Sequence, residues 1–189
     1  WKDWCRKWSE KGAFHKELAN NALLQNKTIS AGTHYKTAAI CYHFGKFLFV
    51  DYPEEMATAH KNAVICYNVA LPLLSPPGER IQIPYEGKNL YGNLRVPTGS
   101  SKPPVVIMVM GLDSTKEEMF TYERDFLERD IATFSFDGPG QGEGEYDFFM
   151  CPEYEKPVSA VISKLKDINS INTQSIGLWG VSMGGYYAP

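Results

Sequence analysis

The chain has 189 residues, 43% of them hydrophobic and 22% charged, and its formal net charge at neutral pH is −3. These values are ordinary for a globular protein with one sizeable core, or a core plus a small appendage. The slight negative charge and the lack of any lysine–arginine run argue against nucleic-acid binding, and no apolar run reaches the roughly 18 residues that a membrane span needs. We therefore expect neither a nucleic-acid nor a membrane partner.

The two ends of the chain and the cysteines indicate the cellular compartment and whether the chain is a fragment. No apolar stretch follows the charged first residues, so we do not expect a signal peptide. The four cysteines form no C-x-x-C pair, and we interpret them as reduced, mostly buried thiols of a cytoplasmic protein. Because the chain starts at Trp1 and stops just after Ser182, we expect both ends to be cuts rather than natural termini.

Residues 1 to about 75 have the periodicity of helices. Three are expected, over about 3–25, 30–49 and 53–74. The third has the clearest start, because Pro53 suits a first helical position and Glu54 and Glu55 favour the positive end of the helix dipole. The pattern is also similar to helical repeats, but no constant period supports that alternative. A Ser-Pro-Pro-Gly cluster at 75–78 is the best domain boundary.

The histidines all lie in this helical part: His15, His34, His43 and His60. One of them could be a metal ligand or a base, but we favour partly exposed helix residues with hydrogen-bonded rings. Cys41-Tyr42-His43 is not a recognised metal-binding spacing, and no second pair completes it. We therefore expect no metal and no cofactor.

From residue 79 the pattern changes to short strands that alternate with helices. We expect a hairpin over 80–84 and 89–96, a buried strand over 105–110, a helix over 115–128, a buried strand over 131–136, a helix to about 168 and a buried strand over 175–179. This order implies a parallel sheet with helices on both faces. Sites in such sheets lie beyond the carboxyl ends of the strands, where the loops at 111–114 and 137–144 are expected.

The second of these loops reads Asp-Gly-Pro-Gly-Gln-Gly-Glu-Gly and could be taken for a dinucleotide-binding loop. That fingerprint requires a helix that opens directly on the glycines. Here a proline interrupts the loop and no helix start follows. We interpret residues 137–144 as a tight backbone bend that borders the active site.

The most informative motif is the G-x-S-x-G match at 180–184, directly after the last predicted strand. In a nucleophile elbow, a sharp strand–helix turn holds the serine in a strained conformation with its hydroxyl exposed, and small flanking residues let strand and helix approach. The alternative is an ordinary glycine-rich turn. The strand before the motif and the helix-compatible segment after it favour the elbow, which makes Ser182 the predicted nucleophile.

Attack by Ser182 on a carbonyl would create an oxyanion, which needs preorganised N–H donors. In such a fold one donor is the residue after the nucleophile, here Met183, and the other lies in the loop after the third strand. We assign that role to the N–H of Leu112, with Gly111 allowing the bend; the alternative is that Leu112 is a plain loop residue. Asp113 is expected to cap the next helix, or else to contact substrate.

The base and its carboxylate are expected beyond residue 189, because the order of the triad in this fold is Ser, then Asp or Glu, then His. Promoting one of the four N-terminal histidines to the base would contradict that order. The fragment alone is therefore expected to be inactive, with neither partner in this chain. It is also expected to expose one side of an unfinished sheet.

Three segments, at 108–118, 136–144 and 180–185, together resemble the α/β-hydrolases with an N-terminal helical domain. This family has a pseudooxynicotine hydrolase branch, a fermentation–respiration switch esterase branch and a fungal polyketide-shortening branch. The resemblance implies a helical domain over 1–78 that covers the substrate. It also implies an α/β-hydrolase core over 79–189 with a mostly parallel sheet, incomplete at its C-terminus.

The resemblance also implies a serine hydrolase that acts on a small carbonyl compound, with Ser182 as the family nucleophile. In the pseudooxynicotine and polyketide branches the bond cut is carbon–carbon, next to a ketone in a 1,3-dicarbonyl. We therefore favour a carbon–carbon hydrolase over a carboxylesterase. The second alternative is a non-catalytic ligand-binding protein on a hydrolase scaffold, which the complete elbow disfavours. Assembly as a homodimer is left open.

Overall fold

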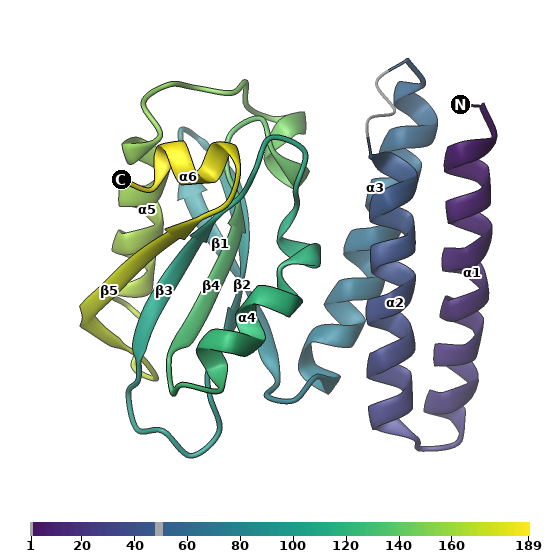
Figure 1. The fold of residues 1–189 in the computed structure, drawn as a ribbon, viewed down its shortest axis with the longest axis horizontal. Helices are drawn as coiled ribbons and strands as arrows, with labels where there is room; N and C mark the ends of the chain where they lie inside the picture. The colour runs from purple at the N-terminus through teal and green to yellow at the C-terminus, as the bar shows by residue number, and fades with distance from the viewer. Residues whose placement is uncertain (1, 48–50) are drawn as a thin grey trace. The chain divides into compact units, whose positions relative to one another are not determined.

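The structure is a computed structural model that describes residues 2–47 and 51–189 (Figure 1). The chain divides into two compact units, Trp1–Pro77 and Gly78–Pro189, which we call the helical unit and the sheet unit. Within the described residues, no helix combines the length and the apolar character that crossing a bilayer would require.

The helical unit consists of packed helices, as predicted. Its described elements are α1 (Lys2–Leu24), α2 (Thr28–Lys46), α3 (Pro53–Ala70) and the 3₁₀ helix η1 (Leu71–Leu73). The α-helical part of α3 is shorter than predicted, because Pro72 has no N–H to donate and the last turn tightens into η1. The predicted end of the second helix, at Phe49, lies outside the described residues.

The core of the helical unit combines alanines with a few tyrosines, so that the helices approach closely where the side chains are small. Gly12 on α1 shows this most clearly, since a Cβ at that position would lie 2.9 Å from the ring of Tyr42 on α2. The hydroxyl of Tyr35 donates a hydrogen bond to Oδ1 of Asn20 at 2.5 Å and so joins the same two helices at a second point.

The histidines differ from the expectation that all four would be partly exposed. His43 and His60 are buried, with exposed fractions of 0% and 1%; each lies one helical turn after an apolar residue, Ala39 and Met56 respectively, and so on the apolar face of its helix. His15 and His34 are half-buried, as expected, and their Nδ1 atoms lie 3.1 Å apart. Burial, together with His34, lowers the pKa of His15. The tautomers of the two rings decide which Nδ1 donates and which accepts.

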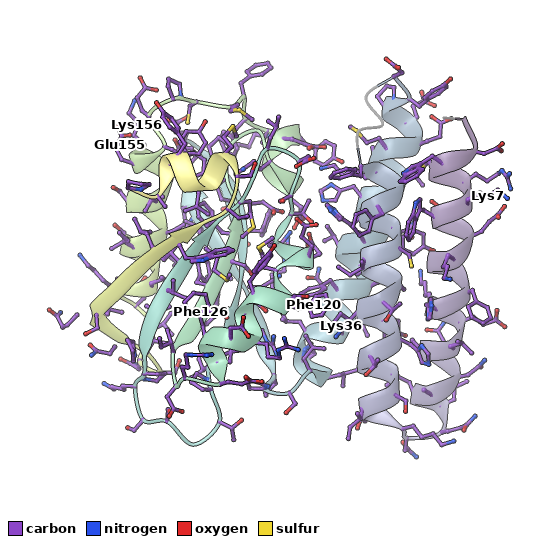
Figure 2. All side chains as sticks on the ribbon, in the orientation of Figure 1. Lys7, Lys36, Phe120, Phe126, Glu155 and Lys156 are labelled. Carbon is purple, nitrogen blue, oxygen red and sulfur yellow. The ribbon has the colours of Figure 1, made fainter. Side chains whose placement is uncertain are left out.

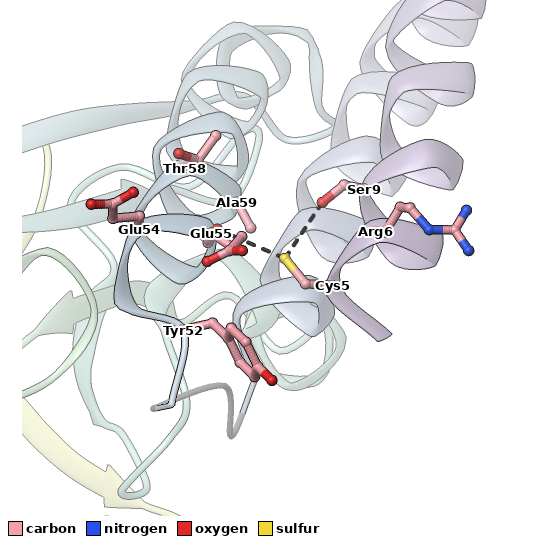
Figure 3. A pocket seen from close by; sticks show the side chains of 8 residues that line it. All are labelled: Cys5, Arg6, Ser9, Tyr52, Glu54, Glu55, Thr58 and Ala59. Atoms are coloured by element: carbon pink, nitrogen blue, oxygen red, sulfur yellow. Dashed lines mark hydrogen bonds between the residues drawn. The ribbon is translucent and has the colours of Figure 1, made fainter. Parts of the chain in front are cut away.

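An open pocket of about 700 Å³ lies between α1 and the start of α3 (Figure 3). Cys5 lines it, and its thiol donates a weak hydrogen bond to the carbonyl oxygen of Glu55 at 3.7 Å. Burial raises the pKa of Cys5, so the pocket offers no reactive thiolate at neutral pH. All four cysteines carry free thiols, and three of them are buried, which confirms their interpretation as reduced and mostly buried.

The sheet unit is a five-stranded mixed sheet with helices on both faces, as expected for an α/β-hydrolase core (Figure 1). Its elements are β1 (Gly78–Tyr85), β2 (Lys88–Arg95), β3 (Pro104–Val109), η2 (Lys116–Glu118), α4 (Phe120–Leu127), β4 (Ala132–Asp137), η3 (Gly142–Tyr146), α5 (Glu155–Leu165), β5 (Asn172–Gly180) and α6 (Met183–Tyr187). The strand order is β1-β2-β4-β3-β5. The hairpin β1–β2 is antiparallel and β2 pairs antiparallel with β4, whereas β4, β3 and β5 run parallel.

Strand β3 lies between two hydrophobic layers because its side chains alternate between the two faces of the sheet. One layer joins Val105, Ile107 and Val109 to the apolar face of α5. The other joins Val106, Met108 and Met110 to Met119 and Phe126. Figure 2 shows Phe126 on the side of α4 that faces the sheet. Burial on both faces explains why the sequence of β3 is a continuous apolar run.

Three expectations for the sheet unit are wrong in detail. The predicted helix over 115–128 is split, with the short η2 followed by α4 from Phe120. Part of the predicted loop at 137–144 forms η3. Strand β5 is longer than predicted, and its residues are half-buried or exposed rather than buried, because β5 pairs on one side only with β3.

Candidate active site

The turn between β5 and α6 has the geometry of a nucleophile elbow. Ser182 has φ 54° and ψ −123°, a conformation that only glycine adopts without strain. The residue is exposed and directly precedes the first residue of α6. Val181 ties the turn to the sheet through a hydrogen bond from its N–H to the carbonyl oxygen of Val109 at 3.4 Å. The serine side chain therefore projects from a turn that is anchored to the end of β3.

The two glycines that flank Ser182 are required by close backbone contacts. A Cβ on Gly180 would overlap the carbonyl oxygen of Gly184, and a Cβ on Gly184 would overlap the carbonyl oxygen of Val109. Strand, turn and helix thus pack backbone against backbone, and no larger residue fits at either position. This is the steric demand on which the sequence prediction was based.

The predicted oxyanion loop lies beside this serine. A Cβ built on Gly111 would lie 3.3 Å from Cβ of Ser182 and 3.5 Å from the carbonyl oxygen of Val181. The structure thus brings together Gly111 and Ser182, which are 71 positions apart in the sequence (182 − 111). The polypeptide reaches this position because β3 and β5 are parallel neighbours whose carboxyl ends meet.

The other predicted site residues lie around the same point of the sheet edge. Met183 follows Ser182 as the first residue of α6, where an N–H has no acceptor within the helix. Leu112 follows Gly111 and is 57% exposed. Asp113 is exposed and does not cap a helix, because η2 begins later and is preceded by Thr115. The expectation of an Asp113 cap is therefore wrong.

Gln141, which sequence analysis did not single out, holds the Gly111 loop. Its Nε2 donates to the carbonyl oxygens of Gly111 at 2.6 Å and Met110 at 3.0 Å. Its Oε1 accepts a hydrogen bond from the hydroxyl of Tyr154 at 2.6 Å. The side chain is buried, and both the nitrogen and the oxygen of its amide group make hydrogen bonds. In the sequence, the feature that could have indicated this role is the presence of one amide side chain within a glycine-rich loop.

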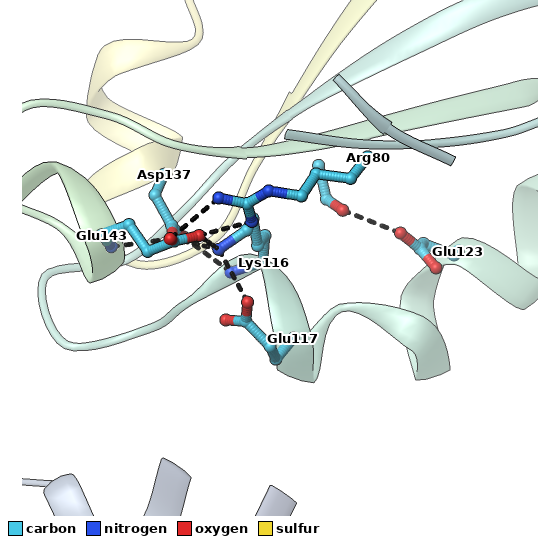
Figure 4. A network of polar contacts seen from close by, with 7 residues as sticks. Arg80, Lys116, Glu117, Glu123, Asp137 and Glu143 are labelled. Atoms are coloured by element: carbon cyan, nitrogen blue, oxygen red, sulfur yellow. Dashed lines mark hydrogen bonds and ion pairs between the residues drawn. The ribbon is translucent and has the colours of Figure 1, made fainter. Parts of the chain in front are cut away.

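A cluster of charged side chains joins β1, η2, the end of β4 and η3 (Figure 4). The ammonium group of Lys116 is fully buried and lies 2.7 Å from a carboxylate oxygen of each of Glu117, Asp137 and Glu143. Arg80 on β1 binds Glu143 with two hydrogen bonds, at 2.6 and 2.8 Å. Asp137 also accepts backbone N–H groups from Lys116 at 2.8 Å and Glu143 at 2.9 Å, so one carboxylate joins η2 to η3.

The charges in this cluster stabilise one another. Burial alone would lower the pKa of Lys116, but the surrounding carboxylates outweigh it and raise the pKa above its ordinary value. Burial alone would likewise raise the pKa of Glu143, but Lys116 and Arg80 lower it below its ordinary value. Lys116 and Glu143 therefore stay charged at neutral pH, and their contacts hold η2 and η3 together.

Known proteins are similar to this chain over almost its whole length. A family model described as "Esterase FrsA-like" matches residues 2–188. A 2,6-dihydropseudooxynicotine hydrolase from Paenarthrobacter nicotinovorans is 38% identical over 98% of this chain and 50% of its own length. The 20-hydroxy-prefusarin hydrolase FUS2 from Gibberella moniliformis is 30% identical over 97% of this chain and 47% of its own length.

Among solved structures, the crystal structure of a 2,6-dihydroxy-pseudo-oxynicotine hydrolase has a TM-score of 0.92 and 37% sequence identity. That match covers 98% of this chain and 52% of the other. The chain thus spans about half the length of the relatives that it matches.

The strain at Ser182 predicts an unusual response to glycine. Ser182→Gly should unfold with a free energy about 1 kcal/mol higher than Ser182→Ala, because relief of about 1–3 kcal/mol of backbone strain outweighs the entropy of glycine in the unfolded chain. Urea unfolding of the two variants measures the difference. The matched control is Ser159 on the exposed face of α5, where glycine should be about 1 kcal/mol less stable than alanine. If glycine were less stable than alanine at both positions, the result would contradict backbone strain at Ser182.

The charge cluster predicts a pH-dependent loss of stability. A carboxyl group with a lowered folded-state pKa contributes stability above its unfolded pKa of about 4.3, and this is lost as the pH falls through the folded-state pKa. Glu143→Gln should therefore lower the free energy of unfolding by about 2 kcal/mol at pH 7. The gap from the wild type should shrink as the pH falls below about 4. Urea unfolding at pH 7, 4 and 3 measures the gap, and a gap that stays constant would contradict this account.

Proposed function

Because the chain belongs to the FrsA-like esterase family, we propose that it is the nucleophile-bearing part of a serine hydrolase that attacks carbonyl carbon. The single observation that carries the proposal is the strained backbone of Ser182 at the end of β5, beside Gly111. Strain of this kind persists only where the surrounding packing imposes it. In a nucleophile elbow, this strained turn exposes the serine hydroxyl to substrate.

In the proposed reaction the hydroxyl oxygen of Ser182 attacks the carbonyl carbon while a base takes its proton. A histidine oriented by a carboxylate supplies the base in such enzymes, and the triad order leads us to expect both beyond residue 189. The oxyanion accepts hydrogen bonds from the backbone N–H groups of Met183 and Leu112. Collapse of the intermediate expels the leaving group, and water then hydrolyses the acyl-enzyme.

We further propose that the bond cut is carbon–carbon, next to a ketone. When a 1,3-dicarbonyl is split, the electron pair of the broken bond is delocalised onto the neighbouring carbonyl as an enolate, which is then protonated. The 38% sequence identity to the 2,6-dihydropseudooxynicotine hydrolase supports this choice, because the three segments at 108–118, 136–144 and 180–185 resemble the branch of the family in which such a carbon–carbon bond is cut. The description of the matching family as an esterase supports carboxylesterase activity as the second candidate.

Other expectations stay predictions. The free, mostly buried thiols are consistent with a reducing compartment such as the cytoplasm. A substrate-covering role for the helical unit and assembly as a homodimer are also predictions. So is the absence of turnover by this chain alone.

A fluorophosphonate probe tests the nucleophile. In the full-length protein we expect covalent labelling at Ser182, because the probe forms a stable adduct with an activated serine. Ser182→Ala should abolish labelling and lower turnover by at least roughly 10⁴-fold. Ser159→Ala, which removes an exposed hydroxyl on α5, is the matched control and should be labelled as the wild type is. A folded full-length protein that takes up no probe would refute the proposal and favour the ligand-binding alternative.

A substrate comparison tests the bond type. The full-length protein is supplied with a 1,3-diketone and a simple ester of similar size, and acid release is followed for each. We expect turnover of the diketone, with a value of kcat/KM at least roughly tenfold above that for the ester, a difference of about 1.4 kcal/mol in the barrier. Turnover of the ester alone would exclude carbon–carbon cleavage and leave the carboxylesterase.

A further inference from the structure

We propose that Gln141 is a positioning residue of the oxyanion hole, which sets the direction of the Leu112 N–H through the carbonyl group of Gly111. The inference rests on the proposed function, in which that N–H is a donor to the oxyanion. It assigns Gln141 a task that neither its motif nor the comparisons identify.

The argument starts from the geometry of one peptide bond. The peptide between Gly111 and Leu112 is planar and trans, so its C=O and its N–H point in opposite directions. Gln141 donates to that C=O at 2.6 Å and to the C=O of Met110 at 3.0 Å. Two hydrogen bonds to consecutive carbonyl groups hold the orientation of the peptide as well as its position. The direction of the Leu112 N–H is therefore set from the far side of the loop.

Gln141 is itself held in place. Its exposed fraction is 1%, and its Oε1 accepts the hydroxyl proton of Tyr154 at 2.6 Å. Burial, with a contribution from Asp137, raises the pKa of Tyr154, so this hydroxyl stays protonated and remains a donor. A Cβ on Gly138 would overlap the Tyr154 hydroxyl, which explains the glycine at that position. The amide of Gln141 cannot turn without breaking all three hydrogen bonds.

The same chain of contacts reaches the second predicted donor. The ring of Tyr154 stacks on the ring of Tyr187, with centroids 4.3 Å apart and an interplanar angle of 9°. Tyr187 is the last residue of α6, the helix that Met183 begins. A path of contacts from Gly111 through Gln141 and Tyr154 to the half-buried Tyr187 thus links the loop of one donor to the helix of the other.

Asp137 fixes the opposite end of the loop. Its carboxylate accepts the backbone N–H of Lys116, at the start of η2, at 2.8 Å. The segment from Gly111 to Lys116 is therefore held at both ends by residues 137 and 141. Two anchors of this kind make the loop a preorganised donor rather than one that must order itself when charge develops.

A purely structural role is the alternative to be excluded, since Gln141 also satisfies two buried carbonyl groups. The two roles differ in what the loss of Gln141 changes. A structural role affects the stability of the protein alone. A positioning role weakens binding of the oxyanion while binding of the ground-state substrate is kept, so kcat falls and KM does not.

The test uses Gln141→Met in the full-length protein, with whichever ester or 1,3-diketone the wild type turns over. Removal of an oxyanion donor lowers kcat by about 10²–10³-fold, and a misdirected donor should approach the lower figure. We expect kcat to fall about 10²-fold at an unchanged KM. Affinity for a trifluoromethyl ketone, which adds to the serine and forms a tetrahedral oxyanion, should fall by a similar factor. Gln82→Met, at an exposed position of β1, is the matched control and should leave both quantities unchanged.

Tyr154→Phe keeps the test decisive if Gln141→Met does not fold. It removes only the hydroxyl that orients Gln141 and keeps the ring that stacks on Tyr187. We expect a smaller loss of kcat, about 5–10-fold, again at an unchanged KM. A Tyr154→Phe protein with wild-type kcat and wild-type affinity for the ketone would overturn the inference.

The outcomes also separate this inference from the proposed function. If the wild type is labelled by the fluorophosphonate and Ser182→Ala is not, the nucleophile stands. A folded Gln141→Met with reduced stability but wild-type kcat and ketone affinity then overturns the positioning role alone. If the wild type takes up no probe, the proposed function fails, and this inference fails with it.

Discussion

The close crossing of β5 and α6 is the constraint on which the rest of the sheet unit depends. Gly180 and Gly184 leave no space for a side chain between strand and helix, and Gly184 also lies against the carbonyl oxygen of Val109 on β3. Ser182, in the middle of the turn between them, has a positive φ as a result and is exposed. This strain persists because β3 is packed on both faces and does not yield.

The loops at the ends of β3 and β4 are held by polar contacts instead of apolar packing. The side chains of Lys116, Asp137 and Glu143 are removed largely or wholly from water, and the desolvation cost of such a cluster makes it a poor source of net stability. The cluster instead fixes the positions of η2 and η3 relative to each other, because its carboxylates contact both elements. Gln141 extends the same arrangement to the backbone beside Ser182.

Features that rest on local patterns could be predicted from the sequence. The helices, the hairpin, the apolar strand β3 and the G-x-S-x-G turn each follow from the spacing of residues within one segment. The contacts of Gln141 could not, because its partner Gly111 is 30 positions away and nothing near either residue marks the pair. The exposure of β5 depends on which strands become its neighbours, which no single segment encodes. The catalytic roles of Ser182, Met183 and Leu112 remain predictions.

The two-sided packing of β3 has a consequence for how the family can vary. Side chains alternate strictly along 104–110, so an insertion or deletion of one residue would transfer every later side chain to the opposite hydrophobic layer. The same change would move Gly111 along the strand axis by about 3.3 Å, away from its place beside Ser182. Length variation among homologues should therefore fall in the exposed turn before Pro104 and avoid the stretch from there to Gly111.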